Sequence, residues 1–183
     1  MITNFKKSDV AEASKSSTLR HILTWYNSQD VDWDELYTQW RQITGGVYDQ
    51  TLPLVEDENS NTPEPITIEC ENGMTMSVAP GETPTDGVAT ISASVAGIDE
   101  TTLELAYQMQ GREGVAIIER CSDGKKFIFA NPCTGGVTFQ YQTIGTLDSN
   151  KAGISFQLTG AGCPRPMLVY EPDSTGEVDD SEE

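Results

Sequence analysis

The sequence has very little of the side-chain chemistry on which most enzymes depend. His21 is the single histidine, although general base catalysis and the activation of a serine or cysteine nucleophile normally use that side chain. The four cysteines, Cys70, Cys121, Cys133 and Cys163, form no C-x-x-C pair, which argues against a zinc ribbon or a redox dithiol. We therefore expect no catalytic, cofactor-binding or metal-binding residues, and we expect the cysteines to be buried, reduced thiols.

Three patterns imitate known site motifs but lack the residues that would complete them. Asp30, Asp32 and Asp34 have the spacing that opens a calcium-binding loop. The sixth position, however, is Glu35 instead of glycine, and the twelfth is Arg41 instead of a bidentate glutamate. The glycine-rich pieces TGG and TGAG lack the Lys-Ser/Thr of a phosphate-binding loop. A carboxylate pair for glycoside hydrolysis stays open, because two acids that meet only in space cannot be recognised in a sequence.

Long apolar runs and basic residues are scarce too. No run approaches the roughly 20 apolar residues of a membrane span, and residues 1–15 lack the apolar core of a secretory signal. We expect no membrane partner, and folding in a cytoplasm.

The chain has only 11 Lys and Arg against 29 Asp and Glu, which gives a net charge of -18. Residues 42–111 contain no base at all. This charge is typical of a solvated surface, and also of one past which DNA must move without adhering.

Residues 1–48 are predicted to form a helical arm. Leu19, Ile22, Leu23 and Tyr26 recur at spacings of three and four, which predicts a first helix. A second apolar stripe with the same spacing follows, and it consists of Trp33, Leu36, Tyr37, Trp40 and Ile43. Asp32 is a suitable N-cap for this second helix, and Gly45-Gly46 is suited to a left-handed C-terminal end. The two helices are too small for a core of their own, so we expect Trp33, Leu36, Trp40 and Ile43 to dock on the rest of the chain or on another subunit as assembly residues.

The remaining chain divides into an acidic, Pro- and Asn-containing linker at 49–65, a β-domain at 66–170 and a disordered acidic tail at 171–183. Three hairpins are expected in the β-domain. They lie around Asn72-Gly73, around the CSDG turn that ends at Gly124, and around the loop at 145–152. Asp99 as a cap and Gly111 as an end favour a short helix between them. The predicted fold class is α+β, mainly β: an antiparallel β-sandwich or barrel of about six to eight strands with one short helix, preceded by the helical arm.

The order of these elements resembles a known class of protein. Apolar strands, a D-G or N-G hairpin and a glycine-marked turn lead to a G-ϕ-S/T-ϕ-ϕ-L-x-G strand, which here is GISFQLTG at 153–160, closed by Pro164, Pro166 and Tyr170. Over residues 66–170 this arrangement resembles small virion structural proteins of tailed bacteriophages and prophages from gut Bacteroidota. The resemblance implies a tail-tube, neck or connector component whose β-sandwich assembles into rings around a DNA channel.

These observations favour a non-enzymatic virion structural protein, assembled in the host bacterial cytoplasm, that forms a ring or tube segment. The resemblance implies a homo-oligomeric ring, six- or twelve-fold, contacts with other tail, neck or portal proteins, and no specific binding of nucleic acid. The main alternative is an immunoglobulin-like adhesin module that binds carbohydrate or a host surface. Trp25, Trp33 and Trp40 all fall in the predicted arm, which disfavours an aromatic binding row on the sheet. A small hydrolase is the third and most remote hypothesis.

Overall fold

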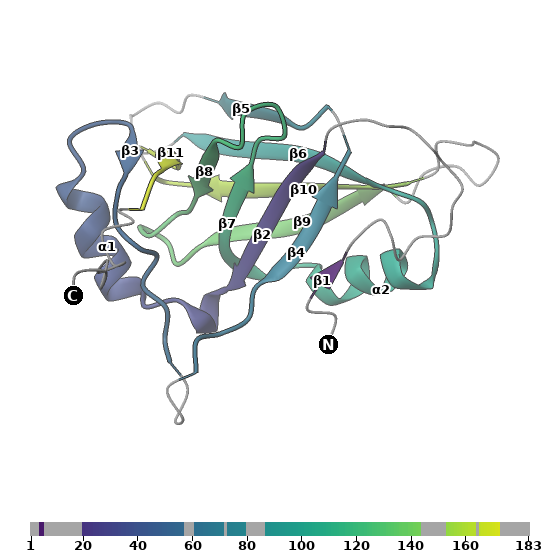
Figure 1. The fold of residues 1–183 in the computed structure, drawn as a ribbon, viewed down its shortest axis with the longest axis horizontal. Coiled ribbons are helices and arrows are strands. Elements are labelled where there is room, and N and C mark those ends of the chain that lie inside the picture. The colour runs from purple at the N-terminus through teal and green to yellow at the C-terminus, as the bar shows by residue number, and fades with distance from the viewer. Residues whose placement is uncertain are drawn as a thin grey trace, which may run out of the picture.

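The protein is mainly β, with eleven strands and two α-helices in the part described by a computed structural model (Figure 1). That part comprises residues 4–5, 20–56, 61–71, 73–79, 87–143, 153–163 and 165–172. The elements are β1 (Asn4–Phe5), β2 (His21–Asn27), α1 (Trp33–Gln42), β3 (Val47–Tyr48), β4 (Ile66–Cys70), β5 (Thr75–Ala79), β6 (Val88–Ala96), α2 (Glu100–Met109), β7 (Glu113–Glu119), β8 (Lys126–Phe129), β9 (Val137–Thr143), β10 (Gly153–Ala161) and β11 (Met167–Tyr170).

All eleven strands belong to one mixed sheet that curls into a half-barrel (Figure 1). The main path runs β1-β4-β2-β7-β9-β10-β6-β5, and β8, β11 and β3 branch from it. The branch arises at β7, which pairs with β9 only at Glu113 and Gly114 and with β8 from Ala116 to Glu119. Two pairs, β1 with β4 and β3 with β11, are parallel. The structure therefore confirms a mainly β fold, but shows one curled mixed sheet where we predicted an antiparallel sandwich or barrel.

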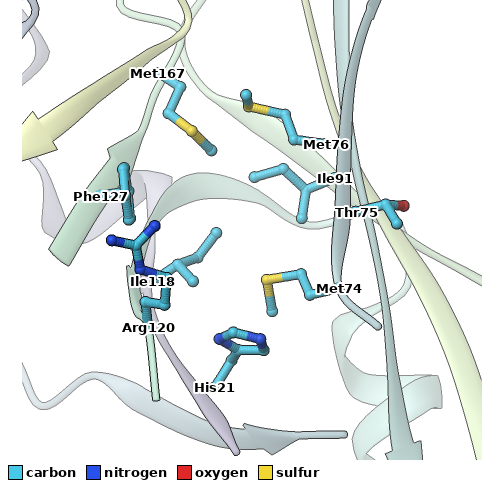
Figure 2. Close-up of a pocket in the computed structure, with 9 residues that line it drawn as sticks. All are labelled: His21, Met74, Thr75, Met76, Ile91, Ile118, Arg120, Phe127 and Met167. Atoms are coloured by element: carbon cyan, nitrogen blue, oxygen red, sulfur yellow. The ribbon is translucent and has the colours of Figure 1, made fainter. Parts of the chain in front are cut away.

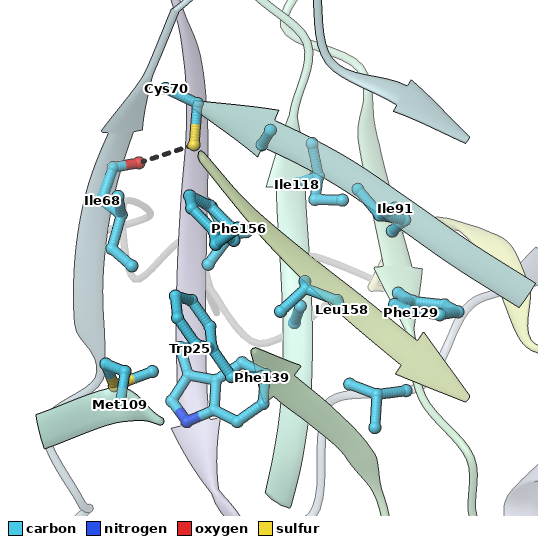
Figure 3. Close-up of a cluster of buried hydrophobic side chains, with 14 of the residues drawn as sticks. Trp25, Ile68, Cys70, Ile91, Met109, Ile118, Phe129, Phe139, Phe156 and Leu158 are labelled. Carbon is cyan, nitrogen blue, oxygen red and sulfur yellow. Dashed lines mark hydrogen bonds between the residues drawn. The ribbon is translucent and has the colours of Figure 1, made fainter. Parts of the chain in front are cut away.

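One apolar cluster fills the inside of the half-barrel (Figure 3). Buried and half-buried residues alternate along β6 and β10, and the antiparallel register places Phe156 opposite Ala93 and Leu158 opposite Ile91. Phe156 stacks on Phe139 with ring centroids 4.6 Å apart, and the Phe139 ring meets the Trp25 indole edge-on at 6.0 Å. Strand alternation thus builds most of this core, and α2 adds Leu105 and Met109.

A second apolar cluster lies on the other side of β7, under α1 and the short strands β3 and β11. β7 has an uninterrupted buried run because it faces both clusters: Ala116 and Ile118 belong to the inner cluster, and Val115 and Ile117 belong to the outer one. Burial on both faces explains why this segment is apolar without alternation. The first part of the predicted linker also packs here, since Leu52 is buried in the outer cluster.

The prediction of a first helix in the arm was wrong, because His21–Asn27 form the strand β2. Leu23 and Trp25, two residues apart, are fully buried and point into the half-barrel, where β2 pairs with both β4 and β7. The β-branched and aromatic residues of ILTWY suit a strand, and the helical spacing of its apolar residues was coincidental. Residues 6–19 lie outside the described residues.

The second helix is confirmed as α1, and its start follows the predicted chemistry. The Asp32 carboxylate accepts a hydrogen bond from the Glu35 backbone N–H at 3.1 Å. Its end differs: α1 stops at Gln42, Ile43 is extended, and neither Gly45 nor Gly46 has a positive φ. The left-handed glycine end was therefore wrong. An Arg165 guanidinium N–H bonded to the Ile43 carbonyl at 2.6 Å occupies this helix end.

In the β-domain, the predicted short helix and one hairpin are confirmed. α2 begins at the Asp99 cap, whose side chain accepts from the Thr102 backbone N–H at 2.8 Å, and β7 and β8 pair around Gly124 at φ +69°. The hairpin around Asn72-Gly73 was wrong: β4 pairs with β2 and β1, whereas β5 pairs with β6 at the far end of the sheet path. β9 and β10 pair as expected. The loop between them and the tail beyond residue 172 lie outside the described residues.

Candidate assembly surface

The edge strand β5 leaves apolar side chains uncovered. All five of its residues are exposed, and within the described residues it pairs with β6 alone. Met76 lies opposite Ile91, and Val78 lies opposite Ala89. Because Ile91 and Ala89 are buried in the inner cluster, Met76 and Val78 continue the apolar inner face of the sheet beyond its covered part. These two side chains are 51% and 57% exposed.

A hollow of about 270 Å³ adjoins this edge strand (Figure 2). Its lining comes from strands distant in sequence: His21, Met74, Thr75, Met76, Ile91, Ile118, Arg120, Phe127 and Met167. Ile91 and Ile118 are buried members of the inner cluster, and three methionine side chains flank the space above them (Figure 2). Unbranched thioether side chains repack easily around different shapes. The hollow is therefore an apolar binding cavity, at the open side of the half-barrel, whose lining can adapt to different side chains.

Few polar groups border the hollow, and the main cation is already paired. The Arg120 guanidinium lies 5.5 Å from the centroid of the Phe127 ring and donates to the Asp123 carboxylate through Nε at 2.8 Å and through Nη2. This pairing with Arg120 lowers the pKa of Asp123 to about 2, so the pair stays ionised over the physiological range. The buried Nδ1 atom of His21 has no hydrogen-bond partner among the described residues. The rim thus offers little net charge to a ligand.

The structure brings the four predicted assembly residues together in the outer cluster, where they pack on their own sheet. Leu36 and Trp40 are buried, and Trp33 and Ile43 are partly buried against them. The Trp33 indole N–H donates to the Ser28 carbonyl oxygen at 2.8 Å, which fixes the start of α1. These contacts hold α1 in place, and a role of the four residues in assembly stays a prediction.

Tyrosine hydroxyls surround this cluster and remain neutral. Tyr48 is buried between the Trp40 ring at 5.5 Å and the Tyr170 ring at 5.9 Å. Burial, together with repulsion from Tyr170 and the nearby carboxylates Glu35 and Asp49, raises the pKa of Tyr48 far above its ordinary value. Burial also raises the pKa values of Tyr26 and Tyr170. Their shifts reflect packing, because each phenol faces the cluster rather than the hollow.

The cysteine prediction is correct for two residues. Cys70 and Cys163 are buried, but Cys121 is half-buried and Cys133 is exposed. All four are free thiols. Burial raises the pKa of Cys70 to about 12 and is the main cause that raises that of Cys163 to about 11. Cys133, which has turned outward from the core, was missed because sequence spacing does not indicate which face of a turn a thiol occupies.

The edge and the hollow were also missed by the sequence interpretation. The sequence interpretation placed MTMSV in a strand of the hairpin around Asn72-Gly73, and in any strand Met74, Met76 and Val78 share one face. It could not show that this face lies at the end of the sheet path, because that depends on β5 pairing with β6 instead of β4. Placing the strand in the wrong hairpin concealed the uncovered side chains.

Within the described ranges, no three His, Cys, Asp or Glu side chains gather closely enough to hold a metal ion. The helices in the same part of the chain are too short and too polar to cross a membrane. No family model, curated protein or solved structure matches the chain.

Proposed function

We propose that this chain is a non-enzymatic structural subunit of a tailed-phage virion, which forms a ring or tube segment of the neck or tail by docking its β5 edge on a second copy of itself. The observation that carries this proposal is the uncovered strand β5, whose Met76 and Val78 extend a core face into solvent. The resemblance of residues 66–170 to small virion proteins supports the setting. The fold is mainly β with a short helix at 100–109.

The chemistry of β5 suits a protein contact. An unpaired strand edge presents free backbone N–H and C=O groups that another strand can complete. Protected edges normally carry lysine, proline or a bulge, whereas Thr75–Ala79 contains no charged residue and no proline. The adjoining hollow can accept an apolar side chain of the incoming copy, as anchor pockets do at the centre of interfaces.

Ring formation sets a further condition on this contact. Only a heterologous contact, in which β5 meets a different surface of the next copy, propagates and closes into a ring. An isologous contact of β5 with β5 would stop at a dimer. The subunit must therefore carry a second surface that accepts β5. Substitutions on β5 should leave that second surface intact.

The charge of the chain is compatible with a DNA channel and opposes assembly in dilute salt. Copies with a net charge of -18 repel one another, and this repulsion is screened over about 10 Å at 0.1 M salt. We therefore expect self-association to strengthen as salt is added. The same charge keeps a negatively charged polymer from adhering to the assembled subunits.

The first test asks where the protein occurs. Mass spectrometry of purified particles from a host that carries the gene should detect this chain in multiple copies per particle, in a ratio to portal protein that fits a closed ring. Absence from particles would refute the virion assignment. Presence in one or a few copies at a fibre tip would favour the adhesin hypothesis instead.

The second test asks how copies meet, using Val78→Lys and the matched control Val55→Lys. Both valines are exposed, at 57% and 48%, and both variants gain one positive charge. By sedimentation velocity at high protein concentration, with or without the adjacent virion protein, wild type and Val55→Lys should associate and Val78→Lys should remain monomeric. Equal association of all three proteins would exclude β5 as the contact.

Mixing experiments separate a ring contact from a dimer contact. In a heterologous assembly, Val78→Lys keeps the surface that accepts β5, so substoichiometric amounts should bind wild-type ends and shorten the assemblies. In an isologous dimer, the variant would be left out and wild-type dimers would form in proportion to the wild-type chain. The second outcome would contradict the ring while preserving β5 as an interface.

A further inference from the structure

Two cysteines distant in sequence are brought close together where the β8–β11 pair ends. β8 and β11 are antiparallel, with Phe129 opposite Met167. One residue further along each chain, the Ala130 backbone N–H donates to the Pro166 carbonyl oxygen at 3.0 Å. Beyond this pair the chain leaves the ladder, and residues 132–135 form a turn that contains Cys133.

A buried asparagine holds the two cysteine-bearing segments together. Asn131 is almost fully buried, and its side-chain amide donates to the Ala161 carbonyl oxygen and to the Thr134 hydroxyl. The backbone carbonyl oxygen of Asn131 accepts hydrogen bonds from the backbone N–H groups of Thr134, Gly135 and Gly136 at 3.0 to 3.2 Å. The turn that contains Cys133 is therefore closed on itself and fixed to the end of β10, two residues before Cys163.

The two thiols are neighbours. The Cys133 side chain is near enough to help raise the pKa of the Cys163 thiol, while Cys163 is only 4% exposed and Cys133 is exposed to solvent. One sulfur is thus accessible to a reagent, and the other lies behind it and is protected. This is the arrangement of an attacking thiol and a resolving thiol.

We propose that Cys133 and Cys163 form an intramolecular disulfide when the protein meets a small-molecule disulfide oxidant of the glutathione type. The Cys133 thiolate attacks one sulfur of oxidised glutathione, forms a mixed disulfide and releases one glutathione thiolate. The Cys163 thiolate then attacks the Cys133 sulfur and releases the second glutathione thiolate. The two protein thiols lose two electrons and two protons in total, and the oxidant is reduced to two glutathione thiols.

The two steps differ in their dependence on pH. Burial raises the pKa of Cys163 to about 11; Arg165 opposes this shift through its backbone N–H and its charge, and the neighbouring Cys133 adds to it. Only a small fraction of Cys163 is therefore the reactive thiolate at neutral pH. The second step should accelerate about tenfold per pH unit while the pH stays well below that pKa. The product links the turn after β8 to the segment between β10 and β11.

The test uses full-length protein with Cys121→Ser, which removes the half-buried third thiol, and oxidised glutathione as the probe. We expect the intact mass to fall by two hydrogen atoms, peptide mapping to identify a Cys133–Cys163 link, and dithiothreitol to reverse both changes. Adding Cys163→Ser should trap one glutathione on Cys133, and adding Cys133→Ser should abolish fast reaction with the probe.

Two results would overturn the proposal. One is a stable glutathione adduct on Cys133 in the parent protein that does not resolve between pH 7 and 10. The other is an unmodified Cys133 after prolonged exposure. Both are measured on the Cys121→Ser protein, which retains Cys133 and Cys163. Neither result therefore depends on whether a variant at these two positions folds. Neither result bears on the β5 contact, because the cysteine pair lies outside β5 and the hollow.

Discussion

The indole N–H of Trp40 donates a hydrogen bond to the carbonyl oxygen of Arg165 at 3.2 Å. Arg165 returns the contact, since its guanidinium donates to the carbonyl oxygen of Ile43 at 2.6 Å, just beyond the end of α1. These two bonds join residues more than 120 positions apart and fasten α1 to the chain that leads into β11. Trp40 also packs on Tyr48, so one side chain supplies both the apolar and the polar contacts of the helix.

Truncation of this side chain should destabilise the whole protein. Trp40→Ala removes a buried indole and leaves the Arg165 carbonyl without its donor, and we expect the free energy of unfolding to fall by roughly 3 to 5 kcal/mol. Tyr37→Ala, on an exposed position of the same helix, should cost less than about 1 kcal/mol. Urea unfolding followed by far-ultraviolet circular dichroism measures both. Equal effects would show that Trp40 does not anchor α1.

Gly114 should tolerate no side chain. A Cβ at this position would lie 2.1 Å from the Tyr26 carbonyl oxygen and 2.8 Å from the Trp25 indole, where β7 passes between β2 and β9. Gly114→Ala must shift backbone, so we expect a loss of more than about 3 kcal/mol. Gly46→Ala is the matched control, because no atom lies within 4 Å of its Cβ. That variant should be neutral or stabilised by less than about 1 kcal/mol. Similar melting temperatures for the two variants would contradict the close approach.

Alkaline pH should weaken the fold through the buried thiol of Cys70. Burial raises its folded-state pKa to about 12 from an ordinary value of 9.0, so the neutral form is favoured in the folded protein. The stabilisation is complete below about pH 9. Between pH 9 and 12 the unfolded chain loses the proton and the native one keeps it, which lowers the free energy of unfolding by up to about 1.4 kcal/mol per pH unit.

Cys70→Ala isolates this contribution. Below pH 8 the free energy of unfolding of the variant should run parallel to that of wild type, offset by the cost of the small cavity. Between pH 9.5 and 10.5 the wild-type curve should fall more steeply and approach that of the variant. Urea titrations at a series of pH values measure the two slopes. Parallel curves throughout this range would show that Cys70 titrates alike in both states.

The features predicted correctly from the sequence are those decided by neighbouring residues. Asp32 and Asp99 cap their helices through N–H groups three residues away, and Gly124 permits the left-handed turn between β7 and β8. The features predicted wrongly depend on distant partners. β2 is a strand because β4 and β7 lie on either side of it, and local periodicity carries no information about that position.

The candidate surface illustrates the same limit. The apolar residues around Met76 predict a strand, yet its apolar face is uncovered because β5 ends the sheet path. The proximity of Cys133 and Cys163 depends on the hydrogen bond from the Asn131 side chain to the Ala161 carbonyl oxygen, which no spacing rule predicts. In contrast, the apolar stripe of α1 was identified from the sequence, and Trp40 and Leu36 are buried as such a stripe requires.

The charge of the chain predicts that duplex DNA will not bind, even in about 20 mM salt, where electrostatic attraction is strongest. The described bases closest together in sequence are Arg120, Lys125 and Lys126, and two of them are paired: Arg120 with Asp123, and Lys126 with Glu119. With 11 Lys and Arg against 29 Asp and Glu, the chain has too few cations to release counterions from phosphates. Fluorescence anisotropy of a labelled duplex should therefore stay flat up to high protein concentration. Binding that weakens steeply with salt, and that is lost in Lys125→Glu but retained in a Lys6→Glu control, would instead reveal a phosphate-binding turn and contradict a subunit whose surface lets DNA pass freely.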